Sequence, residues 1–531
     1  MLRVGILVDS KINSAWIADI INEINRTENI HLAILVHNRN ISIRSMKLGY
    51  NVFRKIDQTF LPGKPNLLTS VNLNLVKDVP SLIATPLKKG QETYYSAKDL
   101  EEIKNTKPDL LLHFDSGILQ GEILTLCKFG VWCIYAGGIS FSDRSVGFWE
   151  WYHKTPITKI SLLQLGIQPK ENGCLWSGVT KTEYLSLSRN QTAVFSKGID
   201  MLIGLLDRYS TSEIQIQPTN NPLNEVLFSN EPGFWASLFA VGKLTSRVVT
   251  KFFTKAFFIE QWVIFFSFTS PRIPQLDFGD FKALMPPKDH IWADPFVVTE
   301  NHKHYIFIEE LSTKTNKGHI SCLVLNNNGE VETSNIIINQ PFHLSYPFIF
   351  RHEGTWFMVP ESADNLTVDL YECLEFPFKW KFRKSLLTNV RAFDATLHFQ
   401  DEKFWLFCTI QKRLGASTNE DLYIFSSHDL LEGEWKSHPG NPVLSDPASA
   451  RPAGKIFFHN NSWYRPSQIC VPRYGYGLSL NKIIKLSESS YTEENVSHAL
   501  PNWKKDLLSV HTLNFTEGIT VIDGQLKRIK I

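Results

Sequence analysis

The sequence predicts a multidomain protein in which an α/β domain with a parallel sheet precedes an all-β five-bladed propeller. Three observations lead to this prediction. The chain of 531 residues is too long for one hydrophobic core. Strand-like and helical segments alternate over the first 200 residues, whereas the second half repeats one hairpin pattern five times. We expect the α/β domain over residues 1–205, a linker and amphipathic helix over 206–260, and the propeller over 261–531.

The first domain contains four apolar runs typical of buried strands. They are RVGILVD from Arg3, HLAILVHN from His31, PDLLLHFDSG from Pro108 and GVWCIYAGG from Gly130, and residues 14–25 have helical spacing. Alternating strands and helices favour a parallel sheet with crossover helices, whose usual ligand site lies at the carboxyl ends of the strands. The sequence has neither GxGxxG nor a Walker motif, so we predict no nucleotide cofactor.

A polar segment rich in Pro and Asn, TSEIQIQPTNNPLNEVLFSNEPG, is typical of a linker. In the next segment Lys243, Arg247, Lys251 and Lys255 recur every four residues, opposite Leu, Val and Phe. Two interpretations of this 231–260 helix stay open. One is peripheral contact with an anionic membrane surface. The other, which we favour, is a helix that packs its apolar side on a neighbouring domain and leaves its lysines in water.

The propeller prediction rests on five phrases that each combine a strand, a tight turn and an aromatic-rich returning strand. They begin at Trp292, Tyr346, Asp394, Arg451 and His511. Their spacing of about 50 to 60 residues is close to one four-stranded blade. The intervening ENHKH, HEG, QDEK, HNN and TEG are turn signals, so each phrase is expected to form an antiparallel hairpin. QWVIFFSF before the first phrase has the pattern of a strand that closes the ring.

The same phrases predict where the site lies. A hairpin returns its second strand to the level where the first began, and the innermost strands of a propeller surround its axis, so the five openings should converge on one funnel. A ring of carboxylates, arginines and histidines there suits a polyhydroxylated ligand. For any single residue the alternative is a turn cap or an ion pair between blades. The candidate binding residues are Trp292, Glu309, Glu310, His319, His343, Tyr346, Arg451, Arg465, Gln468 and His511, beside the carboxylates of Asp294, Asp394 and Glu361.

Bulk properties exclude some classes of partner. A net charge of +2 gives no electrostatic case for a nucleic-acid partner. The seven cysteines are scattered and none forms a CxxC, which favours free thiols over disulfides or a metal site. The chain starts directly with a strand-like run, and no apolar stretch approaches about 18 residues. We therefore expect a soluble, cytoplasmic protein without a metal; its oligomeric state is not predicted.

The stretch from Pro108 through GVWCIYAGGISFSDRSVGFWEW resembles the core of the formyltransferases that use 10-formyltetrahydrofolate. The resemblance covers roughly residues 1–190. The family's catalytic Asn and His, and a later Asp, correspond to Cys133, Tyr135 and Glu171. Cys and Tyr do not supply the base and oxyanion donor that formyl transfer needs, so we expect neither folate nor formyl transfer. A ligand or partner site and a retained scaffold both stay open for the loop with Gly137, Gly138, Ser140, Asp143 and Arg144.

In the second half IWADPFVV, PFHLSYPFIF, MVPE, RAFDATLHF and SARPAGKIF occur in order. They are similar to the N-terminal domain, itself like glycoside hydrolase family 43, of plant glucosamine inositolphosphorylceramide transferases and bacterial relatives. The resemblance spans roughly 285–520. It implies that Asp294 is a general base and that Asp394 orients and tunes the acid. The family's acid opens the fourth blade, where this chain has Arg451.

Glu361 is the best substitute for the missing acid, with Glu309 and Glu310 behind it. Arg451 and Arg465 are expected to lower the pKa of nearby acids and to suit a substrate carboxylate or phosphate. Three hypotheses follow. The first is an enzyme that cleaves or transfers a glycosidic bond of an anionic or amino-sugar-containing glycan in surface-glycan metabolism. The second is a non-catalytic glycan or glycolipid-binding module, and the third is a formyl or acyl transferase on an amino sugar.

Overall fold

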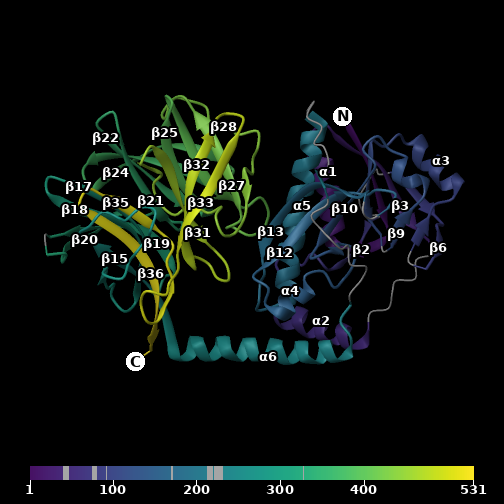
Figure 1. The fold of residues 1–531 in the computed structure, drawn as a ribbon, viewed down its shortest axis with the longest axis horizontal. Helices are drawn as coiled ribbons and strands as arrows, with labels where there is room; N and C mark the ends of the chain where they lie inside the picture. The colour runs from purple at the N-terminus through teal and green to yellow at the C-terminus, as the bar shows by residue number, and fades with distance from the viewer. Residues whose placement is uncertain are drawn as a thin grey trace. The chain divides into compact units, whose positions relative to one another are not determined.

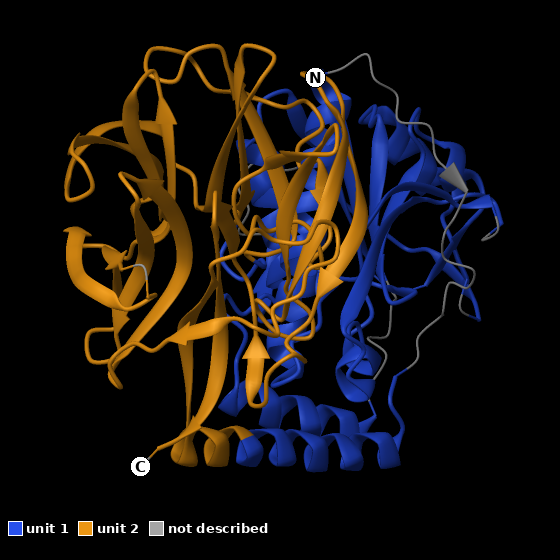
Figure 2. Cartoon of the chain, turned by 60° about the vertical axis from the view of Figure 1, so that its left-hand side comes forward, with its two compact units in different colours: residues 1–250, 413–417 blue, residues 251–412, 418–531 orange. Residues whose placement is uncertain are grey.

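The computed structural model describes residues 1–39, 47–73, 80–90, 92–115, 117–168, 171–211, 219–220, 231–326 and 328–530. The chain divides into two compact units, shown in two colours in Figure 2. Unit 1 comprises Met1–Thr250 with Arg413–Ser417, and unit 2 comprises Lys251–Lys412 with Thr418–Ile531. The predicted linker at 211–233 lies largely outside the described residues.

Unit 1 is built on a mixed sheet in the order β14-β13-β12-β10-β8-β1-β3-β5. Strands β1 (Leu2–Val8), β3 (Ile30–Asn38), β5 (Ser81–Ala84), β8 (Leu110–Phe114) and β10 (Val131–Ala136) are parallel, which confirms the four predicted strands. An antiparallel extension was not predicted: β11 (Ile139–Ser140), β12 (Ile157–Gln164), β13 (Gly173–Lys181) and β14 (Thr219–Asn220). Short strands form two further small sheets: β2 (Ile12–Ser14) with β4 (Ser70–Asn72), and β6 (Leu87–Lys89) with β7 (Glu92–Tyr94) and β9 (Ile118–Gln120).

Helices cover this sheet and complete its core. Helix α1 (Ala15–Arg26), predicted at residues 14–25, buries Trp16, Ile20 and Ile24 at helical spacing. The Trp16 ring stacks on Phe195 of α5 (Leu187–Thr211) with centroids 5.3 Å apart, so the two helices share one core with the sheet (Figure 1). The other helices of unit 1 are α2 (Leu48–Phe60), α3 (Ala97–Asn105) and α4 (Phe148–His153).

Helix α6 (Phe234–Phe257) does not pack as we expected. Its buried residues are Ser237, Ala240 and Leu244, and the last two join a cluster with α2, α4 and α5. Most of its aromatic residues are exposed instead. The reason is that Lys243 and Arg247 lie on the packed side, over the rings of Tyr152 and Trp151. In the described part of the chain, no helix combines the length and hydropathy needed to cross a membrane.

Unit 2 is all-β, and its described residues form five antiparallel sheets (Figure 1). The first combines β15 (Phe258–Ser267) and β16 (Lys282–Leu284) with β34 (Leu507–Ser509), β35 (Leu513–Thr516) and β36 (Ile519–Ile529). The other four sheets follow in chain order. The second sheet contains β17 (His290–Glu300), β18 (Lys303–Ser312), β19 (Lys317–Leu325) and β20 (Val331–Ile338), and the third contains β21 (Ser345–His352), β22 (Thr355–Ser362), β23 (Thr367–Glu375) and β24 (Lys379–Thr388). The fourth contains β25 (Ala392–Gln400), β26 (Lys403–Ile410), β27 (Asp421–Ser427), β28 (Lys436–Ser437) and β29 (Leu444–Ser445), and the fifth contains β30 (Phe457–His459), β31 (Ser462–Ile469), β32 (Gly477–Leu486) and β33 (Tyr491–Ala499).

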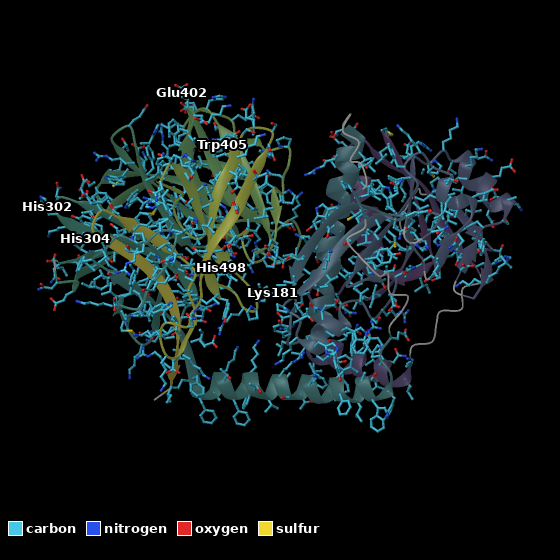
Figure 3. The ribbon with its side chains drawn as sticks, viewed as in Figure 1. Lys181, His302, His304, Glu402, Trp405 and His498 are labelled. Atoms are coloured by element: carbon cyan, nitrogen blue, oxygen red, sulfur yellow. The ribbon has the colours of Figure 1, made fainter. Side chains whose placement is uncertain are left out.

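All five predicted hairpins are present, as β17–β18, β21–β22, β25–β26, β30–β31 and β35–β36. The predicted strand before the first phrase is β15, which pairs with β36 along its whole length, from Phe258 opposite Ile529 to Ser267 opposite Thr520. The two ends of unit 2 are thereby held in one sheet. The turn residues His302 and Glu402 lie at the outer edge of the unit (Figure 3). The candidate site residues are at the other, open end of these hairpins, where the first strand begins and the second strand ends.

Candidate functional site

The first strands of three sheets share one irregularity. Each has a register shift against its partner, between Ala293 and Phe296, Ser345 and Phe348, or Phe393 and Thr396. Each shift contains a non-glycine residue at positive φ: Asp294 at 51°, Tyr346 at 43° and Asp394 at 51°. Such bulges redirect a side chain and are common beside active sites, and the left-handed backbone costs about 1–2 kcal/mol per residue. Three repeats of a costly conformation at the predicted positions indicate a functional constraint.

A cavity of about 260 Å³ lies in unit 2 where these strands open. It contains three acids and three basic side chains, together with aromatic rings. This composition matches the predicted ring of charged groups and aromatics. The lining residues are Trp262, Ile291, Ala293, Asp294, Glu309, His343, Ser345, Glu361, Phe393, Arg451, Tyr474 and His511.

One side of the cavity is a buried network around Asp294. Thr512 Oγ1 donates to Asp294 Oδ1 at 2.9 Å, and the Tyr346 N–H donates to Oδ2 at 3.2 Å. His511 Nε2 lies 3.7 Å from Asp294 Oδ1, and His511 Nδ1 lies 2.6 Å from Asp523 Oδ2. The Trp262 ring stacks on the imidazole with centroids 4.0 Å apart. These contacts hold Asp294 in place at the cavity wall.

Burial is the main cause that raises the pKa of Asp294 to about 7, with a downward contribution from His511 and upward ones from neighbouring carboxylates. Burial alone would lower the pKa of His511, but Asp523 and Asp294 raise it to about 9. Asp294 therefore titrates near neutral pH while His511 stays protonated. A carboxylate with such a pKa is suited to act as a general base.

Atoms of Asp294, His511 and Asp523 lie within 4.8 Å of one another, close enough to share a metal ion. His511 is protonated at neutral pH, however, and a protonated imidazole has no free lone pair. The arrangement is therefore an ion-paired network at that pH.

A second group of buried charges at the cavity is centred on Arg451. Its Nε donates to Asp394 Oδ2 at 2.6 Å and its Nη2 to Asp394 Oδ1 at 3.2 Å, while Glu361 Oε2 lies 3.5 Å from Nη2. The guanidinium also lies over the rings of Phe393 and Tyr474, 5.2 and 5.0 Å from their centroids. The cation is thus already compensated by the protein.

Our expectation that arginines lower the pKa of the nearby acids is wrong for the net shift at Glu361. Burial and the charge of Asp394 raise the pKa of Glu361 well above its ordinary value, and the opposing effect of Arg451 is smaller. The structure brings Asp294 and Glu361 into one cavity as carboxyl groups of raised pKa.

The remaining predicted acids and histidines form separate pairs. His343 Nε2 lies 3.1 Å from Glu309 Oε1 in the cavity wall, and this contact outweighs burial to raise the pKa of His343. Glu310 faces His319 at 3.5 Å and accepts from Trp292 Nε1 at 3.2 Å. Glu310, His319 and Trp292 do not line the cavity. Trp292 is also the cross-strand neighbour of Glu310 in the β17–β18 hairpin.

Four further predicted residues do not line the cavity: Tyr346, Asp394, Arg465 and Gln468. Tyr346 is fully buried, where its hydroxyl contacts Thr396 and accepts from the Gly454 N–H at 2.7 Å. Gln468 donates to Asp394 Oδ2 at 2.7 Å, so both residues support Arg451 from behind. Arg465 is fully buried and donates to Glu493 at 2.7 and 2.8 Å, so it is not available to a ligand in the cavity.

Sequence reasoning missed Trp262, Ser345, Phe393 and Asp523. Trp262 and Asp523 lie on the paired strands β15 and β36, at the two ends of unit 2, so only long-range pairing brings them to the site. The one local signal was an Asp inside the apolar run TVIDG, since a buried carboxylate needs a partner.

In unit 1 the strand that resembles the formyltransferase core ends in a closed polar cluster. Cys133 Sγ lies 3.6 Å from Ser140 Oγ, which lies 2.9 Å from Ser142 Oγ. Burial raises the pKa of Cys133 to about 11 and that of Tyr135 well above its ordinary value. Neither residue can act as a base near neutral pH.

The other predicted loop residues make local contacts. Asp143 Oδ1 accepts from Ser145 N–H at 2.7 Å, and the Arg144 carbonyl accepts from Tyr50 at 2.9 Å. Glu171 is exposed and accepts from the Gln168 N–H at 3.2 Å. Gly137 and Gly138 both have positive φ, and a Cβ at Gly137 would lie 1.9 Å from Glu150 Oε1. These glycines are therefore explained by the turn itself.

Residues 282–524 match the family described as "Glucosamine inositolphosphorylceramide transferase 1, N-terminal". Proteins named glucosamine inositolphosphorylceramide transferase 1 are similar to this chain. The one from Arabidopsis thaliana is 33% identical over 245 residues, 44% of this chain and 32% of that protein. The one from Oryza sativa subsp. japonica is 33% identical over 216 residues, 40% and 29% respectively. The chain thus spans about a third of the length of these relatives.

Solved structures are more distant. Zg3597, a family 117 glycoside hydrolase of Zobellia galactanivorans, is 12% identical with a TM-score of 0.33, over 50% of this chain and 90% of its own. Glycinamide ribonucleotide transformylase 1 from Symbiobacterium toebii is 12% identical with a TM-score of 0.28, over 41% of this chain and 91% of its own. At these TM-scores the likeness carries no further conclusion.

Proposed function

We propose that the five sheets of unit 2 are the blades of a propeller, and that the cavity at their open ends is a carbohydrate active site. The observation that carries this proposal is the cavity that contains both Asp294 and Glu361, each with its pKa raised by burial. The match of residues 282–524 to a family named for a glucosamine transferase supports a carbohydrate ligand. The reaction is cleavage or transfer of a glycosidic bond.

The two carboxyl groups have different roles in this proposal. Asp294 loses its proton near pH 7, so it serves as the base that activates the attacking hydroxyl or water. Glu361 keeps its proton to higher pH than an ordinary glutamate, so it serves as the acid that protonates the departing oxygen. Arg451 and Asp394 position Glu361, because the Asp394 N–H donates to Glu361 Oε2 at 3.3 Å and Arg451 contacts the same oxygen.

Charge favours an amino sugar over an anionic group among the predicted ligands. The three basic side chains at the cavity already face carboxylates: Arg451 faces Asp394, His343 faces Glu309 and His511 faces Asp523. A substrate phosphate would compete with these carboxylates, whereas an ammonium group adds to them. Trp262 and Tyr474 offer the aromatic surfaces that sugar rings contact. The substrate class is therefore a glycan that contains glucosamine or a similar amino sugar.

Activity on defined substrates tests this proposal. The full chain would be incubated with aryl glycosides of glucosamine, N-acetylglucosamine and glucuronic acid, and with glucosamine-containing glycolipids, and products would be followed by mass spectrometry. We expect turnover of a glucosamine substrate that Asp294→Asn and Glu361→Gln both abolish. Turnover of glucuronides alone would contradict the charge argument. Undiminished turnover in both variants would contradict the site.

A non-catalytic glycan-binding module is the second candidate. The observation that favours it is Arg451, which stands where the resembling hydrolase family has its acid and contacts Glu361, the carboxyl group that catalysis would use as the acid. Binding of a glucosamine glycan without bond cleavage or transfer would support this candidate. The hypothesis of a formyl or acyl transferase receives no support from the buried Cys133 and Tyr135.

A further inference from the structure

Helix α6 exposes an apolar surface that its fold does not explain. The aromatic face of α6 comprises Phe234, Trp235, Leu238, Phe239, Val249, Phe252, Phe253 and Phe257, and every one of these side chains is exposed. Trp235 and Phe252 are 67% and 69% exposed. At 100° per residue these positions fall on one side of the helix, opposite the buried Ser237, Ala240 and Leu244. Gly242, Thr245 and Ser246 interrupt this side in the middle of the helix, so the aromatic face consists of two apolar patches. Monomeric proteins rarely leave apolar patches of this kind in water without a partner.

The charges of α6 indicate which partner fits. The helix contains no Asp or Glu, and its basic residues are Lys243, Arg247, Lys251 and Lys255. Lys243 and Arg247 contact aromatic rings of unit 1, and Arg247 also donates to the carbonyls of Tyr184 and Trp151. Lys251 and Lys255 are exposed on the side of the helix opposite the aromatic face. A helix with exposed lysines on its polar side and aromatic residues on the other side suits an anionic membrane surface, whose headgroups attract the lysines.

Helix α2 contacts the start of α6 and also exposes apolar side chains. A Cβ placed on Gly49 would lie 3.3 Å from Ser237 Cβ, so the two helices are in contact there. Leu48 of α2 is 81% exposed and Val52 is also exposed, with Lys55 exposed on the same helix. Apolar and basic side chains thus accompany the N-terminal end of α6.

We propose that α6 lies in the interface of an anionic membrane, with its aromatic face among the acyl chains and Lys251 and Lys255 at the phosphate level. Such helices lie parallel to the surface and insert about 5–10 Å deep. Trp and Phe suit this depth, since aromatic rings concentrate at membrane interfaces. The inner face of α6 stays packed on unit 1 through Ala240 and Leu244, so insertion requires no unfolding. This inference does not depend on the activity proposed for the cavity.

Vesicle flotation with the full chain tests the proposal. The parent would be mixed with vesicles of phosphatidylcholine alone or with added phosphatidylglycerol. The triple variant Trp235→Ser, Phe239→Ser, Phe253→Ser removes aromatic residues from both patches of the aromatic face. The matched control is Phe382→Ser, Phe399→Ser, Phe458→Ser, which removes three comparably exposed aromatic residues from unit 2. We expect the parent and control to float with anionic vesicles, and the α6 variant to lose binding by about tenfold or more.

Charge reversal separates the electrostatic part. Lys251→Glu with Lys255→Glu should reduce flotation with anionic vesicles and leave the weaker binding to phosphatidylcholine unchanged. A parent that floats with neither vesicle would overturn the proposal, as would an α6 variant that floats like the control. Sedimentation identifies the competing occupant: if the parent is a dimer that the α6 variant converts to a monomer, and no vesicle binds, a second copy of the chain covers this face.

Discussion

Arg451 donates two hydrogen bonds to Asp394, at 2.6 and 3.2 Å, and both side chains are buried, with Arg451 in the cavity wall. This bidentate pair uses both oxygens of the Asp394 carboxylate. It converts a residue that could bind substrate anions into one that positions Glu361. In the proposed mechanism the chemistry depends on Asp294 and Glu361, while Arg451 and Asp394 maintain their surroundings.

Loss of Arg451 should lower the free energy of unfolding, because Arg451 is the buried counter-charge of Asp394. Arg451→Met leaves Asp394 buried and unpaired, which costs about 3–5 kcal/mol. The double variant with Asp394→Asn should recover most of that loss, because no uncompensated charge remains. Urea unfolding of the two variants checks this. Equal stability of the single variant and the parent would show that the pair does not form.

Arg465 should behave as a purely structural residue. It is fully buried and paired with Glu493, so Arg465→Met is expected to lower the unfolding free energy by a similar amount, about 3–5 kcal/mol. The affinity of the folded fraction for a glucosamine glycan should not change, because Arg465 is outside the cavity lining. Calorimetry at a temperature well below unfolding measures both parent and variant. Weaker binding by the folded variant would place Arg465 in the ligand site.

Asp294 should cost stability above neutral pH. Its pKa is raised to about 7 in the fold from an ordinary value near 3.8, so the folded state binds more protons than the unfolded state between these values. Stability contributed by this group is present at low pH and is lost as pH rises to about 7. Asp294→Asn removes the charge, and Asn tolerates positive φ well. We expect the free energy of unfolding of the variant, relative to that of the parent, to increase by on the order of 2 kcal/mol between pH 5 and pH 8.

Thermal unfolding of parent and Asp294→Asn across that range measures the difference. Thr512→Val is the control, since it removes a hydrogen bond to Asp294 without removing the carboxylate. The gain of Asp294→Asn over the parent should be absent in this control. A constant difference between Asp294→Asn and the parent at all pH values would mean that Asp294 titrates normally.

The pH profile of turnover should follow the same two groups. Activity is expected to rise as Asp294 loses its proton near pH 7, and to fall at higher pH as Glu361 loses the proton that its raised pKa retains. Glu361→Gln cannot donate a proton, so it should remove the activity altogether. Profiles of kcat/KM between pH 5 and pH 10 check this expectation. A profile that is flat through pH 7 would exclude Asp294 as the base.

Local patterns in the sequence predicted the hairpins and the residues that open them. Asp294, Asp394, Arg451 and His511 meet at one site because each lies at the start of a hairpin, ahead of the turn signal, at a similar position in its repeat. The other contacts around the site depend on pairing between residues that are farther apart in the sequence. The sequence pattern placed Arg465 near a strand end, as expected for a ligand residue, but Arg465 lies in the middle of β31 and its partner Glu493 is on β33, two strands away in the same sheet. No pattern within one strand predicts that contact.

The behaviour of α6 shows a second limit of sequence patterns. Its periodicity predicted an amphipathic helix, and the helix is there. Periodicity cannot say which side packs, because Lys243 and Arg247 can reach over aromatic rings and so lie on the packed side. The small residues Ser237 and Ala240 were the available signal, since close packing between helices favours small side chains.

The central claim is that the cavity of unit 2 uses Asp294 and Glu361 to act on a glucosamine glycosidic bond. The most direct test is single-turnover product analysis of the parent, Asp294→Asn and Glu361→Gln with a glucosamine-containing glycolipid, with binding measured in the same samples. We predict that all three bind, that only the parent converts the substrate, and that Asp294→Asn loses about 10²- to 10⁴-fold in rate. Equal binding by all three with no conversion by the parent would contradict the claim and leave a glycan-binding module.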